Sequence, residues 1–426
     1  MSLLAQRSRV PPPVYLVLAG LAVSFIPGVE RFHLPPQLVF YGFLPPLVYA
    51  AAFVTAPREA RENWRFILVL AFGLTAATLF AVGLVGWALL PALGAGGAFV
   101  LGAVLGPTDP VSATAVLGHT SAPERLRTIL EGESLVNDGV GLVAFSIALT
   151  AVEHGSFSAL DGLVKFLYVS AGGIAFGVVV AWLVERVRVR VHDAMIEISL
   201  SVLTPFVAYI PADKLHLSGI LATVACGVYL GWRSPGFFMP EVRLRSYAFW
   251  NALTFLLTAV LFVLLGTQFR GVLHGASGRL ILDPLLIFGV LTGVRFLWML
   301  TAVRDTVRDR IVLGWSGMRG ALSLAAALSI PLAVAQRDQI LYLTFTTILA
   351  GLVVLALPLP WLLDLLGFEP GGADEAEARE RLRHLEEIAA RRSELERMEQ
   401  RGEISHAAAR RIELDLDREE TLLNRR

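Results

Sequence analysis

Residues 96–118 have the sequence GGAFVLGAVLGPTDPVSATAVLG, an apolar stretch with Pro107, Asp109 and Pro110 at its centre. It is long enough to cross a bilayer, which takes roughly 20 apolar residues. Proline removes a backbone donor and clashes with the preceding turn, so the helix is predicted to break at residues 106–110. Broken backbone at membrane depth is tolerated only against protein or a water-filled cavity. The stretch therefore indicates an ion site or, alternatively, a proline kink in which Asp109 caps the second half-helix.

A second interruption of the same kind lies in the apolar stretch 310–333. Its central sequence, GWSGMRGALS at residues 314–323, combines three glycines with Arg319. Two broken segments in corresponding halves of a chain are the best sequence indication of a transporter site. These two are the fourth and the eleventh apolar stretches of the chain. They are seven spans apart. Because this number is odd, the two stretches cross the membrane in opposite directions, as an inverted repeat requires.

The whole chain has the composition of a polytopic membrane protein. Of its 426 residues, 55% are hydrophobic and 17% are charged, too few charges for the surface of a soluble protein of this length. Its net charge of zero gives no indication of nucleic-acid binding, and the single cysteine, Cys226, excludes an intrachain disulfide.

Hydropathy predicts twelve membrane-spanning helices, at residues 13–28, 37–54, 66–90, 96–118, 124–151, 162–184, 194–210, 216–231, 247–267, 281–302, 310–333 and 338–366.

The segments between these spans alternate in charge. One set carries sixteen arginines and the other carries only five basic residues, which predicts that both termini are cytoplasmic.

Residues 369–426 are rich in Arg, Glu and Ala and are predicted to form a soluble helical tail, with a hairpin turn near Gly402. The simpler interpretation of this tail is a solvated helix without a ligand. We therefore expect a transmembrane domain at 1–368 and a cytoplasmic tail at 369–426.

The span at 124–151 carries the sequence GESLVND at residues 132–138. Ser134 and Asp138 are four residues apart and share one helix face, while Glu133 and Asn137 form the adjoining stripe. An aspartate facing lipid would cost about 3 kcal/mol or more, so Asp138 is expected to face a wet or paired interior. These oxygen atoms suit a hard monovalent cation or a proton. The alternative is a polar contact between helices.

Other charges within the spans have simpler interpretations. Glu133 and Arg295 fall at the same depth, in the cytoplasmic halves of their spans, so we expect a structural ion pair between them. Glu131, Lys165 and Glu197 lie near span ends, where their side chains are expected to reach the membrane interface.

Four motifs together resemble the sodium/proton exchanger branch of the monovalent cation/proton antiporters, in particular its bacterial members. They are GPTDP at 106–110, GESLVND at 132–138, HLSGI at 216–220 and GMRGA at 317–321. The resemblance covers essentially the whole membrane part. It implies an all-α fold of two inverted repeats with two crossing discontinuous helices. It also implies a dimerisation domain and a mobile core domain, whose helices here would be 66–151 and 281–366.

The same resemblance implies the site residues. Asp138 would be the carboxylate that carries the cation or the proton, with Asp109, Ser134 and the Thr108 backbone as further Na+ ligands. Asn137 belongs to the Asn-Asp pair that marks the electroneutral branch of the family.

Three further positions would support this site, and two features depart from the family pattern. Glu133 and Arg295 match the family's structural ion pair, and Arg319 would balance the helix ends. Ala50 stands where relatives usually have an acidic residue that can help to bind the cation. The family usually has thirteen spans, and the unmatched one would precede Pro11. We expect either that the given sequence starts inside this first helix or that the protein has dispensed with it.

The expected function is secondary active antiport of a monovalent cation, Na+, against H+, in pH and sodium homeostasis. We expect a homodimer in the bacterial inner membrane, in contact with lipid, without a cofactor and without enzymatic catalysis. No GxxxxGK[ST] sequence is present, which excludes a P-loop ATPase. The alternatives are a K+/H+ exchanger and a cation channel. An intramembrane hydrolase is disfavoured because no Gly-x-Ser-x-Gly sequence is present.

Overall fold

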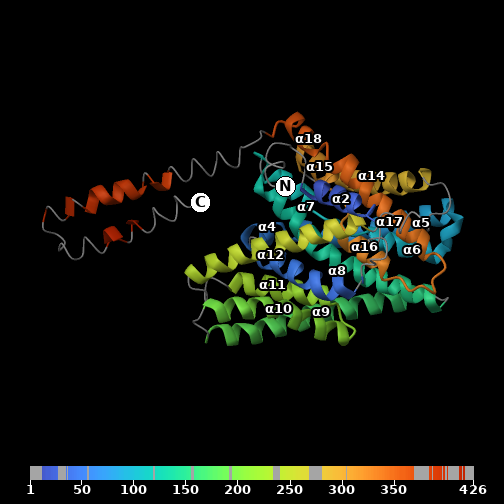
Figure 1. Cartoon of the computed structure of the whole chain (residues 1–426), viewed down its shortest axis with the longest axis horizontal. Helices are drawn as coiled ribbons and strands as arrows, with labels where there is room; N and C mark the ends of the chain where they lie inside the picture. Colours follow the sequence, from blue (N-terminus) through green and yellow to red (C-terminus); the bar gives the residue numbers. More distant parts are fainter. Residues whose placement is uncertain are drawn as a thin grey trace. The chain divides into compact units, whose positions relative to one another are not determined.

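The computed structural model describes most of the chain as helices, and none of the described residues lies in a strand (Figure 1). The described residues are 12–26, 35, 37–54, 57–118, 120–154, 158–190, 194–233, 240–267, 281–303, 305–368, 383–385, 387–395, 397–398, 401, 412–414 and 416–417. The predicted turn at Gly402 and the segment before Pro11 lie outside them.

The described residues up to Leu365 form a series of α-helices with short 3-10 and π-helical segments, which are labelled η. In chain order they are α2 Pro12–Val23, η2 Leu38–Phe43, α3 Leu44–Val54, α4 Pro57–Leu68, η3 Val69–Leu74, α5 Thr75–Leu89, η4 Pro91–Leu93, α6 Gly94–Leu105, α7 Val111–Leu117, α8 Glu124–His154, α9 Ala159–Arg188, α10 Ala194–Lys214, α11 Gly219–Arg233, α12 Pro240–Thr267, α14 Leu282–Ala302, α15 Val307–Trp315, α16 Ala321–Leu328, α17 Arg337–Ala350, η6 Gly351–Ala356 and α18 Leu359–Leu365.

Seven of the described helices are long and apolar enough to span a membrane. They are Glu62–Leu89, Glu124–His154, Leu160–Arg188, Met195–Lys214, Ala248–Thr267, Leu282–Ala302 and Arg337–Leu365. Shorter apolar helices lie at Pro12–Val23, Leu38–Phe53, Pro91–Leu105 and Gly219–Arg233. The chain is therefore an all-helical multi-pass membrane protein. The count of twelve crossings stays a prediction, because a half-helix beside a break is too short to span a bilayer by itself.

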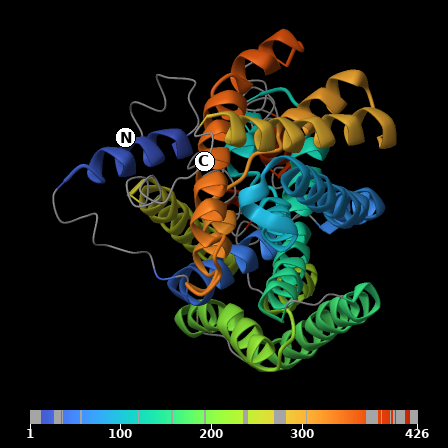
Figure 2. The same cartoon turned by 90° about the vertical axis from the view of Figure 1, so that its right-hand side faces the viewer.

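The helices α9, α10 and α11 pack against one another, and α10 and α11 also pack against α3; Figure 2 shows α9 and α10 in green. A cluster of buried side chains joins these helices to α12 and includes Tyr49, Phe53, Leu230 and Trp250. At about 25 cal/mol per Å² of buried apolar surface, such aromatic side chains contribute strongly to this packing. The indole nitrogen of Trp250 donates a hydrogen bond of 2.9 Å to a serine hydroxyl of α10.

The helices α2 and α12 approach one another closely through glycines. A Cβ atom at Gly20 or at Gly266 would collide with backbone atoms of the facing helix. Glycine is needed at these two positions because any side chain would force the helices apart. This contact holds α12 in place, and α12 forms one wall of the cavity described below.

The chain divides into two compact units, residues 1–116 with 123–362, and residues 117–122 with 363–426. In the second unit, Arg392 and Asp417 form an ion pair of 2.5 Å between two helical segments of the tail. Ile388 and Leu416 are buried there. The division into a transmembrane domain at 1–368 and a cytoplasmic tail stays a prediction.

Candidate functional site

The two predicted helix breaks lie against one another. The first separates α6, which ends at Leu105, from α7, which begins at Val111, and the second separates α15 from α16. The backbone N–H of Asp109 in the first break donates a hydrogen bond of 2.9 Å to the carbonyl of Met318 in the second. Two segments 209 residues apart therefore meet through their irregular backbone.

Asp109 caps the second half-helix and also faces the cavity of the site. Its Oδ1 atom accepts a hydrogen bond of 3.0 Å from the backbone N–H of Val111, the first residue of α7. Such a cap satisfies one of the free donors at a helix start. The side chain lies so close to Gly320 that a Cβ atom there would collide with its carboxylate. Glycine at 320 thus allows the two breaks to come together.

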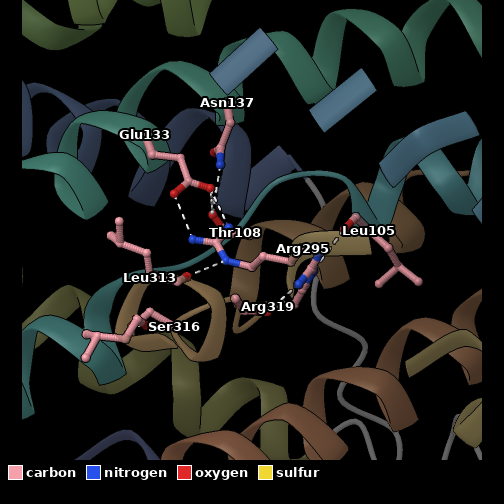
Figure 3. A network of polar contacts seen from close by, with 10 residues as sticks. Leu105, Thr108, Glu133, Asn137, Arg295, Leu313, Ser316 and Arg319 are labelled. Carbon is pink, nitrogen blue, oxygen red and sulfur yellow. Dashed lines mark hydrogen bonds and ion pairs between the residues drawn. The ribbon is translucent and has the colours of Figure 1, made fainter. Parts of the chain in front are cut away.

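The carboxyl ends of the two half-helices are each held by a buried arginine (Figure 3). Arg319 Nε donates to the carbonyl of Leu105 at 3.0 Å, and the guanidinium also contacts the carbonyl of Gly317. Arg295 Nε donates to the carbonyl of Leu313 at 2.8 Å, in the last turn of α15. A helix end exposes free carbonyls with a partial negative charge, which a guanidinium stabilises.

Arg295 also forms a bidentate ion pair with Glu133 of α8. Its Nη1 and Nη2 atoms lie 2.5 and 2.8 Å from Oε1 and Oε2 of the carboxylate. Both residues are 1% exposed. The charge of Glu133 is therefore fully engaged inside the protein, 162 residues from its partner in sequence.

The side chains of Thr108 and Asn137 extend this network (Figure 3). Thr108 Oγ1 donates to Glu133 Oε1 at 3.2 Å, and it accepts from Asn137 Nδ2 at 2.9 Å. Both residues are buried. Their side chains thus connect the first helix break to α8 and to the ion pair, although both residues belong to the predicted cation-binding set.

Asp138 and Ser134 face a cavity of about 610 Å³ that also contains Asp109 and Thr108. Four of the five predicted cation-binding residues therefore line one cavity, whereas Asn137 is absent from its lining. Gly320 of the second break and residues 321–323 at the start of α16 form another part of its wall, as does Ala50 of α3. The cavity brings carboxylate, hydroxyl and backbone oxygen atoms together beside irregular backbone, which suits a monovalent cation or a proton.

A family model described as "Sodium/hydrogen exchanger, transmembrane" matches residues 1–365. The chain belongs to this family. An uncharacterized Na(+)/H(+) exchanger of Mycobacterium tuberculosis is 34% identical to this exchanger over 388 residues, which cover 84% of this chain and 71% of the relative. The low-affinity Na(+)/H(+) antiporter NhaS1 of Synechocystis is 31% identical, over 93% of this chain and 77% of its own length.

One further relative and one solved structure are similar to this exchanger. A sodium, potassium, lithium and rubidium/H(+) antiporter of Bacillus subtilis is 32% identical to this exchanger. The match covers 83% of this exchanger and 58% of the relative. The structure of the sodium proton antiporter MjNhaP1 of Methanocaldococcus jannaschii superposes with a TM-score of 0.66 at 20% identity, over 83% of this exchanger and 94% of that chain. This exchanger therefore has the inverted-repeat antiporter fold.

The structure adds residues that the sequence interpretation missed. Asn251, Thr254 and Thr258 of α12 line the cavity, and their spacing of three and four residues could have indicated that they share one side of a helix. Glu197 was expected to reach the membrane interface, and this prediction is wrong. It is 5% exposed and lies 3.5 Å from the buried Arg188 of α9, which supplies a counter-charge inside the protein.

Proposed function

We propose that this exchanger moves Na+ against H+ by competition of the two ions for Asp138. Membership of the sodium/hydrogen exchanger family supports antiport of a monovalent cation against a proton. The observation that carries the assignment of the site is the cavity, because it joins Asp138 and Asp109 to both helix breaks. A discontinuous helix pair is the usual setting of an ion site in secondary transporters.

Asp138 would hold either one proton or one cation. In the cation-loaded state, Ser134, Asp109 and the Thr108 backbone would supply further oxygen atoms, all from residues that line the same cavity. A bare carboxylate is costly to move through the membrane, whereas the loaded, neutralised carboxylate is not. This difference would couple the two ions, so that the downhill gradient of one drives the other without ATP or a cofactor.

Glu133, Arg295 and Arg319 would have structural roles. The Glu133 carboxylate is occupied by two guanidinium nitrogens and by the Thr108 hydroxyl, which leaves it poorly available to a moving ion. The two arginines hold the carboxyl ends of α15 and α6. We infer that these contacts keep the helix breaks at a fixed distance from Asp138.

The site is tested by Asp138→Asn in proteoliposomes with a fluorescent pH indicator. An amide cannot exchange a proton, so cation-dependent proton movement should be lost while the thermal stability stays close to that of the wild type. Glu153→Gln is the matched control, because Glu153 is exposed on the same helix and does not line the cavity. Normal exchange by Asp138→Asn would refute the assignment.

We further propose that the exchange is electroneutral, because Asn137 adds no second carboxylate beside Asp138. Asn137 is buried and bonded to Thr108, so the position contributes no mobile charge. Vesicles whose potential is clamped by K+ and valinomycin test this point. A membrane potential that alone drives proton uptake against Na+ would contradict it.

Exchange of K+ is the second candidate. Ala50 lines the cavity and has no side-chain oxygen atom, so the cation would depend on Asp138, Asp109, Ser134 and the Thr108 backbone for ligands. The same transport assay with Na+, Li+ and K+ at equal concentration ranks the cations. A channel, by contrast, would give a cation current without counter-transport of protons.

The orientation in the membrane is also a proposal, with both termini in the cytoplasm. Cys226 is buried and is the single cysteine, so Cys226→Ser gives a cysteine-free background. In that background, Arg125→Cys and Glu153→Cys place a thiol at either end of α8. An impermeant maleimide added to intact cells should label the thiol at 153 and leave the thiol at 125 unlabelled; the reverse pattern would invert the topology.

We also propose that the exchanger forms a homodimer in lipid, as its family resemblance implies. Native mass spectrometry of the protein released from nanodiscs measures the oligomeric state. A monomer under conditions that preserve exchange would contradict the proposal.

A further inference from the structure

The cavity that contains Asp138 has a second carboxylate on its wall, that of Glu131. Glu131, Ser134 and Asp138 are spaced by three and four residues on α8, and all three line the cavity. At 1.5 Å of rise per residue, Glu131 lies about 10 Å from Asp138 along the helix axis. A cation that moves along this wall toward Asp138 would therefore pass Glu131 first.

Glu131 is held by an ion pair that a cation can replace. Arg127 Nε donates to Glu131 Oε1 at 2.8 Å, and the two side chains are 45% and 33% exposed. Exposed pairs four residues apart on a helix are weak, because water screens both charges. The neighbouring Glu133 is the opposite case, since it is buried and bound through both oxygens.

Three polar side chains of α12 also line the cavity, among apolar ones such as Phe255 and Phe262. Asn251, Thr254 and Thr258 follow one face of α12, at spacings of three and four residues, and all of them line the cavity. The volume of about 610 Å³ leaves room for several water molecules beside the cation. A cation can therefore enter with its water shell, and the amide and hydroxyl groups of α12 can bind that shell.

We propose that Glu131 is an outer site for the hydrated monovalent cation, and that Arg127 competes with the cation for its carboxylate. The inference rests on the proposed function of Asp138 as the inner site. Glu131 raises the local concentration of the cation before the ion loses water at Asp138. Arg127 lines the same cavity and lowers the occupancy of the outer site.

Transport kinetics in proteoliposomes test the outer site. Glu131→Gln should raise the KM for Na+ by roughly two- to fivefold, the effect of one charge at about 10 Å in a wet cavity, while the maximal rate changes less than KM. Arg127→Gln should lower the KM, because the competing cation is removed. The effect of Glu131→Gln should shrink at high concentrations of an impermeant salt, which screens the charge.

Arg125→Gln is the matched control. Arg125 carries the same charge on the same end of α8, pairs with Asp305 at 2.9 Å, and does not line the cavity. Its KM should equal that of the wild type. An equal shift in Arg125→Gln and Arg127→Gln would show that only the surface potential matters, and it would overturn the proposal.

The outcomes also separate this inference from the proposed function. An unchanged KM in both Glu131→Gln and Arg127→Gln, with Asp138→Asn inactive, would remove the outer site and leave the inner site standing. Normal exchange by Asp138→Asn would refute the inner site itself. Because the two variants at the outer site are expected to shift KM in opposite directions, a general loss of protein quality cannot imitate the result.

Discussion

Removal of either partner of the Glu133–Arg295 pair should destabilise this exchanger strongly, and removal of both should cost little more than one. In Glu133→Ala, Arg295 loses two hydrogen bonds of 2.5 and 2.8 Å and keeps the carbonyl of Leu313 as its partner. In Arg295→Ala, the carboxylate keeps only the hydroxyl of Thr108 from this network. Each variant therefore leaves a charge buried at a site where the wild-type residue is 1% exposed.

The loss of one partner of a buried pair costs about 3–5 kcal/mol, because the remaining charge is not solvated. If the two effects were independent, the double variant would lose about 6–10 kcal/mol. We expect instead a loss close to that of one single variant, since the double variant buries neither charge. The interaction energy of the cycle should thus be about 3 kcal/mol or more.

The assay is the unfolding temperature of the purified protein in one detergent at one scan rate, because unfolding of large membrane proteins is often irreversible. The pair Arg127–Glu131 on the same helix is the control. It is half exposed, so Arg127→Ala and Glu131→Ala should each change stability by less than about 1 kcal/mol. Additive losses in the Glu133 and Arg295 cycle would show that the two charges do not depend on one another, and the reasoning would fail.

Two further predictions follow from close contacts. Gly320→Ala should lower the transport rate roughly tenfold or more, because the new Cβ collides with the Asp109 carboxylate and displaces it; Gly289→Ala, where the added Cβ meets no atom within 4 Å, is the control and should transport normally. Trp250→Phe should reduce stability by about 1 kcal/mol through loss of the 2.9 Å hydrogen bond to Ser201, and an unfolding temperature equal to that of the wild type would argue against this contribution.

The sequence predicted those parts of the site that depend only on residues close together in the chain. The prolines at 107 and 110 and the glycines around Arg319 each weaken a helix by themselves, so interruptions at 106–110 and within 314–323 could be predicted without any tertiary information. The order of the apolar stretches also indicated that the breaks belong to opposite repeats. The roles of Asp138 and its neighbours as ion ligands remain predictions.

Hydropathy, proline and glycine act on the residues beside them, so the amino-acid sequence was enough to predict a helical membrane protein with two broken helices. Which side chains contact one another, and which line the cavity, depended on the tertiary structure. It placed Thr108 between Glu133 and Asn137, it brought Asn251, Thr254 and Thr258 of α12 to the cavity, and it buried Glu197 against Arg188. These features depend on contacts between segments far apart in the chain. The neighbours of a residue in sequence do not determine whether its side chain is surrounded by water, by lipid or by a group of opposite charge.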